Sequence, residues 1–360
     1  MNKLCFTVSR LPRVRTGDLD WPFAFSLVDA FLASGGEYFE TGYTYLSGRS
    51  EEVVRRALTE RHPRESFRVL DKLPLDKVSG EADCAEIFAR QCEKCGVDYF
   101  DVYLLDWLNR DNYKKAQEVK APEFLSRLKA EGKAKRIGIS FYGDPETLKT
   151  ILTEHPELEI VQLQVNYADW ESDYLQVKKC HEEAAALGKT VIGTDPFKGG
   201  ALSALPEETA KWLPAGEASQ TLWARRFARS HAELVSEVIS DQDALTEALQ
   251  PTEPISEAEA KAIRAAGKAF ANNMRAIPCV GCNACTHTCP REIVSGDYFR
   301  LYNEYARAPG DLEKLKPFYA DVAGEHGRAS DCVHCGGCEC VCPQHITVTK
   351  WLFRMATLFE

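Results

Sequence analysis

Long hydrophobic runs, an excess of basic charge and a dinucleotide-binding glycine motif are all missing from this sequence of 360 residues. No run of about 18 apolar residues occurs, so we expect no membrane span. The net charge of −10 and the lack of a basic patch argue against a nucleic-acid partner, because phosphate backbones would be repelled. The first residues show no features of a secretory signal. We therefore expect a cytoplasmic protein.

Cysteine, in contrast, is plentiful: there are 14, and eight of them form two runs with one spacing. The pattern C-x2-C-x2-C-x3-C-P covers residues 279–290 and again 332–343. Bacterial ferredoxins use this spacing for two [4Fe–4S] clusters, where three thiolates hold one cluster and the fourth reaches its neighbour. We assign one cluster to Cys279, Cys282, Cys285 and Cys342, and the other to Cys332, Cys335, Cys338 and Cys289.

Zinc sites and disulfides are the alternatives for these cysteines. Structural zinc sites use C-x2-C pairs rather than triplets, and disulfides are rare in a reducing compartment. Two iron–sulfur clusters therefore explain the runs better, and Cys340 is left as a non-ligating thiol.

The chain before residue 270 alternates short apolar runs with amphipathic segments of helical periodicity. This pattern predicts parallel βαβ units, and eight units over about 250 residues suit a (β/α)8 TIM barrel. A doubly wound sheet is the alternative, but no G-x-G-x-x-G follows an early strand. We expect the barrel over residues 1–270, and a small, α-rich, ferredoxin-like iron–sulfur domain over 271–360. The expected strands are 4–7, 37–40, 67–71, 101–105, 136–140, 159–163, 190–194 and 235–239.

The active sites of such barrels form at the C-terminal ends of the strands. Glu40 ends the second expected strand, Lys72 follows the third, Asp106 follows the fourth, and Tyr45 lies in the loop after Glu40. Each residue alone could be a structural ion pair or a rim charge. Because the strands place them together, we predict that they share one catalytic pocket.

With these motifs the chain resembles the aldo/keto reductase superfamily, specifically its subgroup with a C-terminal ferredoxin-like domain. The resemblance covers nearly the whole chain and combines both cysteine runs with several shorter motifs. Those motifs are YFETGYTYLSGRSEE (38–52), LP (73–74), YFDVYLL (99–105), GISF (138–141), QLQVNY (162–167) and DPFKGG (195–200).

The resemblance implies that a nicotinamide cofactor gives a hydride to a carbonyl carbon while a tyrosine donates the proton. That tyrosine matches Tyr45, and the lysine that lowers its pKa matches Lys72. Ser140 and Gln162 match the residues that usually hold the nicotinamide carboxamide. The segment Lys198, Gly199, Gly200 can line a phosphate in the loop after the seventh strand.

The sequence departs from the family at two of the four catalytic positions, because Glu40 replaces an aspartate and Asp106 replaces a histidine. Glutamate keeps the charge that pairs with Lys72. An ionised Asp106 would oppose a developing oxyanion, so Asp106 can help only if burial keeps it protonated. One branch of the superfamily, the steroid 5β-reductases, has glutamate at this histidine position and reduces an enone C=C bond. C=C reduction of a conjugated carbonyl is therefore a plausible variant.

The loops that meet the cofactor also depart from the family. Residues 4–12 lack the usual glycines, and residues 240–243 (SDQD) replace a common Gly-Met-Ser. Two aspartates would repel a 2′-phosphate, so NAD is preferred over NADP.

The leading hypothesis is an iron–sulfur oxidoreductase that reduces a carbonyl or a conjugated enone of a small molecule. Clusters move single electrons and nicotinamide moves pairs, so a flavin or a redox partner protein is a further candidate for connecting them. Two other hypotheses are an electron-transfer subunit with an altered barrel, and a nonredox lyase or isomerase with structural clusters.

Overall fold

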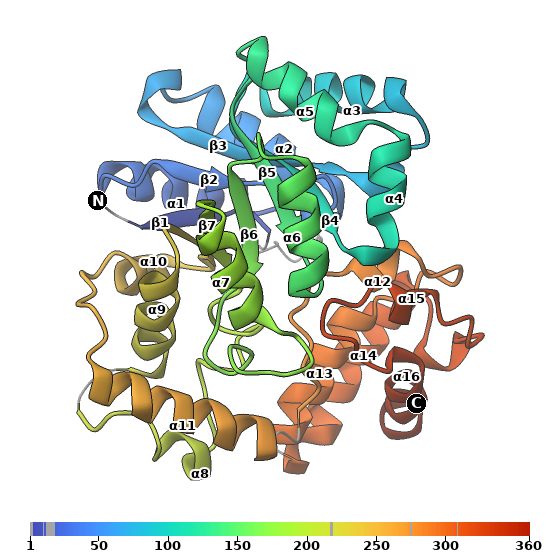
Figure 1. Ribbon diagram of the computed structural model, residues 1–360. Helices are drawn as coiled ribbons and strands as arrows, with labels where there is room; N and C mark the ends of the chain where they lie inside the picture. The colour runs from blue at the N-terminus through green and yellow to red at the C-terminus, as the bar shows by residue number, and fades with distance from the viewer. Residues whose placement is uncertain (1–2, 10, 12–18, 217–218, 274–275, 308) are drawn as a thin grey trace. The chain divides into compact units, whose positions relative to one another are not determined.

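Eight parallel strands close into a barrel in the computed structural model, which describes residues 3–9, 11, 19–216, 219–273, 276–307 and 309–360 (Figure 1). Each strand pairs with the next in the sequence, and β1 pairs with β8. The predicted barrel is thus confirmed. The strands are β1 (Leu4–Thr7), β2 (Tyr38–Glu40), β3 (Arg68–Pro74), β4 (Phe100–Leu108), β5 (Ala134–Phe141), β6 (Ile160–Gln164), β7 (Thr190–Thr194) and β8 (Leu234–Val238).

Helices follow the strands, as parallel connections require. Local signals set several of their ends: Asp144 accepts a hydrogen bond from the Thr147 N–H at the start of α6, and Gly96 ends α3 in a left-handed conformation with φ 68°. The helices are α1 (Trp21–Ala33), α2 (Ser50–Val53), α3 (Glu81–Cys95), α4 (Arg110–Glu118), α5 (Ala121–Ala130), α6 (Pro145–Glu154), α7 (Val177–Ala186), α9 (Gln220–His231) and α10 (Gln242–Ala248).

The inside of the barrel has an apolar layer and, one step further along the strands, a polar layer. The apolar layer is formed by Cys5, Leu70, Val102, Leu104, Ile160, Ile192 and Leu234, with Tyr38 packed against it. Side chains two positions apart on a strand point to the same face. The residues two positions after this layer toward the C-terminal strand ends are Thr7, Glu40, Lys72, Asp106, Gln162, Thr194 and Ser236. The polar side chains therefore gather where barrel enzymes carry their active sites.

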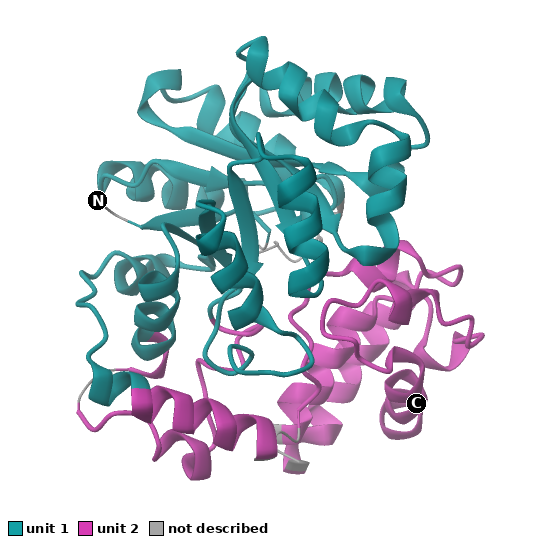
Figure 2. Ribbon diagram, viewed as in Figure 1, with its two compact units in different colours: residues 1–196, 222–260 teal, residues 197–221, 261–360 magenta. Residues whose placement is uncertain are grey.

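The chain divides into two compact units, one of residues 1–196 with 222–260 and one of residues 197–221 with 261–360 (Figure 2). The second unit packs around a core that includes the aromatic residues Tyr298, Phe299, Tyr302, Tyr319 and Phe359. No helix in the described part of the chain is long and apolar enough to cross a membrane. The remaining helices are α8 (Glu207–Ala210), α11 (Glu257–Asn273), α12 (Ala284–His287), α13 (Ser295–Arg307), α14 (Leu312–Glu325), α15 (Gly337–Cys340) and α16 (Val348–Phe359).

Candidate functional site

Glu40, Tyr45 and Lys72 form a hydrogen-bonded triangle in the polar layer. The Lys72 ammonium donates to Glu40 Oε1 at 2.5 Å and to the Tyr45 hydroxyl at 2.7 Å. The Tyr45 hydroxyl donates to the same Glu40 oxygen at 3.1 Å. Glu40 and Lys72 are each only 1% exposed, so their ion pair is shielded from solvent. The structure thus brings three of the four predicted catalytic side chains into direct contact.

The loop between β2 and α2 carries Tyr45 to this position. The Ser50 hydroxyl shares a hydrogen bond of 2.8 Å with the Thr41 hydroxyl and donates to the carbonyl of Gly42 at 2.9 Å. A Cβ at Gly42 would lie 3.3 Å from the Tyr45 ring, so a side chain there would crowd the tyrosine. The glycine and the buried hydroxyls in this loop therefore hold Tyr45 against Lys72.

The electrostatics keep both Tyr45 and Lys72 in their protonated forms. Burial raises the pKa of Tyr45 well above its usual value, and Glu40 and Asp106 add to the rise although Lys72 opposes it. Burial lowers the pKa of Lys72, but Glu40, Tyr45 and Asp106 together raise it well above its usual value. The resemblance implies a lysine that lowers the pKa of the tyrosine. Lys72 acts in that direction, and the surrounding burial and carboxylates outweigh it.

Asp106 lies at the same end of the barrel and is half-buried. Burial raises its pKa, Glu40 adds to the rise, and Lys72 together with a hydrogen bond from Ser140 opposes it. The register between β4 and β5 shifts between Leu105 and Leu108, and Trp107 within this irregular stretch has a positive φ of 62°. Backbone strain of this kind gathers at functional sites.

Trp107 and Tyr142 form an aromatic pair beside Asp106, and no sequence motif predicted it. Their rings stack with centroids 4.4 Å apart and an interplanar angle of 23°. Tyr142 also raises the pKa of Tyr45, which places the pair within electrostatic range of the proposed acid. The aromatic residues directly after the fourth and fifth strand ends are the only sequence signal for this pair.

A second buried network supports Lys72 from outside the barrel, and sequence reasoning missed it as well. The Gln91 amide donates to the carbonyl of Lys72 and to Glu51, each at 3.0 Å, while the Tyr103 hydroxyl donates to Gln91 at 2.6 Å. Asp71 accepts from the Lys72 N–H at 2.8 Å. No spacing in the sequence distinguishes these residues from ordinary helix and strand positions.

Ser140 and Gln162, the expected carboxamide ligands, are buried in the polar end of the barrel. Gln162 donates to Glu40 Oε2 at 3.0 Å. A side-chain amide and a hydroxyl can each donate and accept hydrogen bonds, so the chemistry of Gln162 and Ser140 suits a nicotinamide carboxamide.

A lysine that binds phosphate needs its ammonium group within reach of the ligand, and the Lys198 side chain is placed differently. It is 4% exposed and donates to the Gln344 side chain at 2.6 Å. Gly199 and Gly200 both have positive φ, of 62° and 94°. The phosphate role of this loop stays a prediction.

The first predicted set of cysteines comes together in the second unit. Burial raises the pKa of Cys282, and Cys279, Cys285 and Cys342 add to the rise, which places these three thiols within electrostatic range of Cys282. Cys342, from the second run, is therefore near Cys282 of the first run.

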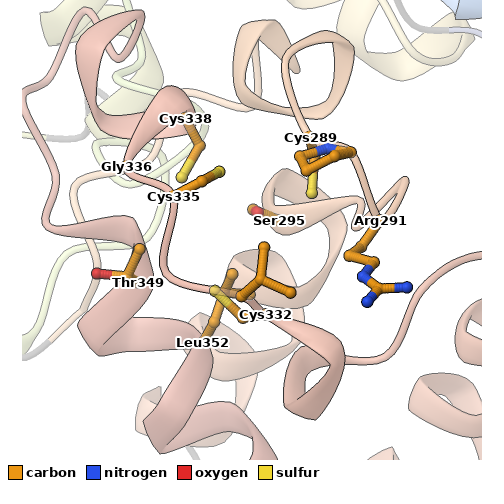
Figure 3. A pocket seen from close by; sticks show the side chains of 11 residues that line it. Cys289, Arg291, Ser295, Cys332, Cys335, Gly336, Cys338, Thr349 and Leu352 are labelled. Atoms are coloured by element: carbon orange, nitrogen blue, oxygen red, sulfur yellow. The ribbon is translucent and has the colours of Figure 1, made fainter.

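The second predicted set lines one pocket (Figure 3). Cys289 from the first run lies around the same space as Cys332, Cys335 and Cys338. Cys285 also raises the pKa of Cys338, so the two sets approach each other there. Cys340 does not line the pocket and is exposed.

All fourteen cysteines of the chain are free thiols, so no disulfide competes for them. Among the residues that the structure describes, no three His, Cys, Asp or Glu side chains are placed to hold a single metal ion. A cluster of several iron atoms suits two runs of four cysteines each better than zinc does.

Comparisons with known proteins agree with both parts of the chain. Residues 11–243, more than half of the chain, match the aldo/keto reductase family. Residues 278–347 match the 4Fe-4S dicluster domain. The chain therefore belongs to the aldo/keto reductase family and carries a 4Fe-4S dicluster domain after the barrel.

The individual relatives are distant. An aldo-keto reductase of Mycolicibacterium smegmatis is 31% identical over 128 residues, which is 35% of this chain and 44% of that protein. The NADH-specific methylglyoxal reductase of Escherichia coli is 24% identical over 228 residues, which is 58% of this chain and 67% of that protein. The chain thus spans less than half of the first relative and about two thirds of the second.

Solved structures show the same barrel. An aldo-keto reductase from Bacillus halodurans, in its holo form, has a TM-score of 0.61 at 21% identity, covering 74% of this chain and 92% of that one. An aldo-keto reductase from Klebsiella pneumoniae in complex with NADPH has a TM-score of 0.57 at 18% identity, covering 72% and 89%. At these identities the likeness shows the fold alone.

Proposed function

We propose that the protein is an oxidoreductase that reduces the carbonyl group, or the conjugated C=C bond, of a small molecule. The observation that carries the proposal is the buried triangle of Glu40, Tyr45 and Lys72 at the C-terminal strand ends. A phenol beside a shielded ammonium is suited to general-acid catalysis. NADH, when bound, supplies the hydride.

Tyr45 is the proton donor in this proposal. Its raised pKa keeps the phenol protonated until a substrate oxygen develops negative charge. Lys72, which donates to the phenol oxygen, then stabilises the phenolate left after the proton has moved. Glu40 holds the ammonium in place through one oxygen, and Gln162 holds the other oxygen of Glu40.

Asp106 is the acid that faces the substrate in this proposal. A protonated carboxyl donates a hydrogen bond to a carbonyl oxygen, whereas a carboxylate repels the developing charge. The raised pKa of Asp106 shifts it toward the protonated form. This arrangement extends the chemistry from simple carbonyls to a conjugated enone, whose oxygen also gains charge when its C=C bond is reduced.

Ser140 and Gln162 would hold the nicotinamide, and we propose NAD rather than NADP. Asp241 precedes α10 directly and Asp243 lies in its first turn, and hydrogen bonds from Ala244 and Ser240 lower the pKa of Asp241. Ionised carboxylates there would repel a 2′-phosphate. One matched relative is named NADH-specific, which agrees with this choice.

The eight cysteines would hold two [4Fe–4S] clusters in the sets described above, which supply one-electron transfer. Hydride transfer moves two electrons, so a flavin or a redox partner protein is the proposed connection between the clusters and the barrel.

An anaerobic titration tests the proposal. The purified protein is mixed with NADH or NADPH, and binding is followed by nucleotide fluorescence while the cluster absorbance is recorded. Methylglyoxal, suggested by the named relative, and a simple cyclic enone serve as first substrates. We expect NADH to bind more tightly than NADPH and to be oxidised when a substrate is added. If neither nucleotide binds, the proposed function is wrong.

A further inference from the structure

Lys198 is a buried cation that contacts Gln344 of the iron–sulfur unit. It belongs to residues 197–221, which form one compact unit with residues 261–360. Its ammonium lies 2.6 Å from Gln344 Oε1, and both side chains are more than nine-tenths buried. Lysine is seldom buried to this extent without a functional or structural reason.

Gly199, next to Lys198, and Gln344 both lie close to cysteines of the first set. Gly199 packs so closely against Cys279 that an added Cβ would lie 2.6 Å from the Cys279 carbonyl oxygen. Gly199 also has a φ of 62°, which favours glycine. Gln344 follows Cys342 by two residues, so Lys198 and Gly199 together contact the segments that carry two of the four cysteines of this set.

The segment that contains Gln344 supplies a hydrogen bond to the Cys342 sulfur. The Ile346 N–H donates to Cys342 Sγ at 3.4 Å. Cluster potentials depend on hydrogen bonds to the sulfurs, on nearby charge and on solvent exposure. Lys198 affects the first two of these.

The second set of cysteines has different surroundings. Cys335 is exposed, and the basic residue at its pocket, Arg291, is exposed too. Water screens an exposed charge far more strongly than a buried one. The basic residue at the pocket of the second set is therefore exposed, whereas Lys198 beside the first set is buried.

We propose that Lys198 is a positioning residue that raises the reduction potential of the cluster bound by Cys279, Cys282, Cys285 and Cys342 above that of the second cluster. Reduction adds one electron to the cluster and hence one negative charge, which a buried ammonium stabilises. Electrons would then pass from the second cluster, which has the lower potential, to the first cluster, which has the higher one. This proposal rests on the proposed binding of two clusters, but not on carbonyl reduction.

A redox titration that is monitored by electron paramagnetic resonance tests this proposal. Dithionite serves as the one-electron reductant. In Lys198→Met, we expect one of the two couples to shift to lower potential. At a fixed potential its ratio of reduced to oxidised form should fall about tenfold, which corresponds to about 59 mV for a one-electron couple. A Cys335→Ala background, in which only the first set is complete, identifies the couple that shifts.

Three further variants separate charge from packing. Lys198→Gln keeps a hydrogen-bond donor without the charge and should shift the same couple, whereas Lys198→Arg keeps the charge and should stay near the wild type. Lys316→Met removes a lysine from the surface of α14, where it pairs with Glu313, and should change neither couple. Unchanged couples in both neutral variants would contradict the proposal, as would equal shifts of both couples.

A purely structural role has its own signature. If neither Lys198→Met nor Lys198→Gln assembles both clusters, as measured by iron content, Lys198 is a scaffold residue and the proposal fails. A normal shift without any turnover of carbonyl or enone substrates would support the role of Lys198 and reject the proposed function instead.

Discussion

Glu40 shows how a side chain longer than the family's aspartate is accommodated. Its Oε1 accepts hydrogen bonds from Lys72 and Tyr45, and its Oε2 accepts one from Gln162. Both oxygens of this buried carboxylate are thereby satisfied, as a charge out of water requires. The extra methylene does not separate the carboxylate from the lysine, so the pairing that the resemblance implies is possible with glutamate.

Tyr45→Phe should abolish most of the turnover while leaving nucleotide binding in place. The variant removes only the hydroxyl, and loss of a positioned proton donor costs about 10²–10⁴-fold in rate. Steady-state rates with NADH and the best available substrate measure this. Tyr43→Phe is the matched control, because it removes a hydroxyl from the same loop outside the triangle. Equal rates in Tyr45→Phe and the wild type would show that another group donates the proton.

The protonation of Asp106 predicts a dependence of stability on pH. Because the folded-state pKa is raised, the folded protein keeps a proton that the unfolded chain releases from about pH 4 upward. In that window the folded state binds more protons, so this group makes the unfolding free energy fall as pH rises through its folded pKa. Asp106→Asn cannot ionise, and its stability relative to the wild type should therefore grow as the pH rises above about 4.

Urea unfolding followed by tryptophan fluorescence at several pH values measures that difference. Asp111→Asn, at an exposed position of α4, is the control and should track the wild type at every pH. A constant difference between Asp106→Asn and the wild type would mean that Asp106 is ionised throughout.

The positions of the strands could be predicted closely from the sequence. Each buried strand is a short apolar run, and the predicted β1 and β7 have the observed bounds. α4 was not predicted, because only Tyr113 and Ala116 of its nine residues are buried and no helical periodicity stands out. Placement of Glu40, Lys72 and Asp106 followed from strand ends alone. The Trp107 and Tyr142 stack depends on a local backbone irregularity that no sequence pattern encodes.

Gly138 on β5 is required by the interior of the barrel. A Cβ there would lie 2.1 Å from the carbonyl oxygen of Ile160 on the neighbouring strand, and backbone atoms cannot give way as a flexible side chain can. Gly138→Ala should lower the unfolding free energy by about 1–3 kcal/mol or more, as overpacking does. Gly80→Ala, where no atom lies within 4 Å of the added Cβ, should cost far less. Urea denaturation of both variants measures the costs, and similar values would show that β5 and β6 can separate freely.

At the scale of the whole molecule, the sequence did not predict the contacts between segments that lie far apart along the chain. Lys198 and Gln344 are 146 positions apart, and nothing in either motif indicates their contact. For the same reason, the grouping of residues 197–221 with the iron–sulfur unit is not visible in the sequence. The exchange of cysteines between the two runs stays a prediction, and it rests on the C-P ending of each run.

That exchange gives a prediction that separates crossed binding from one cluster per run. If Cys289 belongs with Cys335, the double variant Cys289→Ala with Cys335→Ala damages a single cluster, although its changes fall in different runs. The variant Cys342→Ala with Cys335→Ala changes two cysteines of one run and should damage both clusters. The placement of Cys342 near Cys282 and of Cys289 in the Cys335 pocket supports this pairing.

Iron analysis and electron paramagnetic resonance distinguish the outcomes, from a wild-type content of about eight iron atoms for two cubanes. The Cys289 and Cys335 double variant should keep one intact cluster and its redox couple, and the Cys342 and Cys335 variant should keep neither. Cys340→Ala, which removes an exposed cysteine outside both sets, should retain the full iron content. The reverse result for the two double variants would mean that each run binds its own cluster. Lys198 would then contact segments that belong to different clusters, and its effect could no longer be confined to one couple.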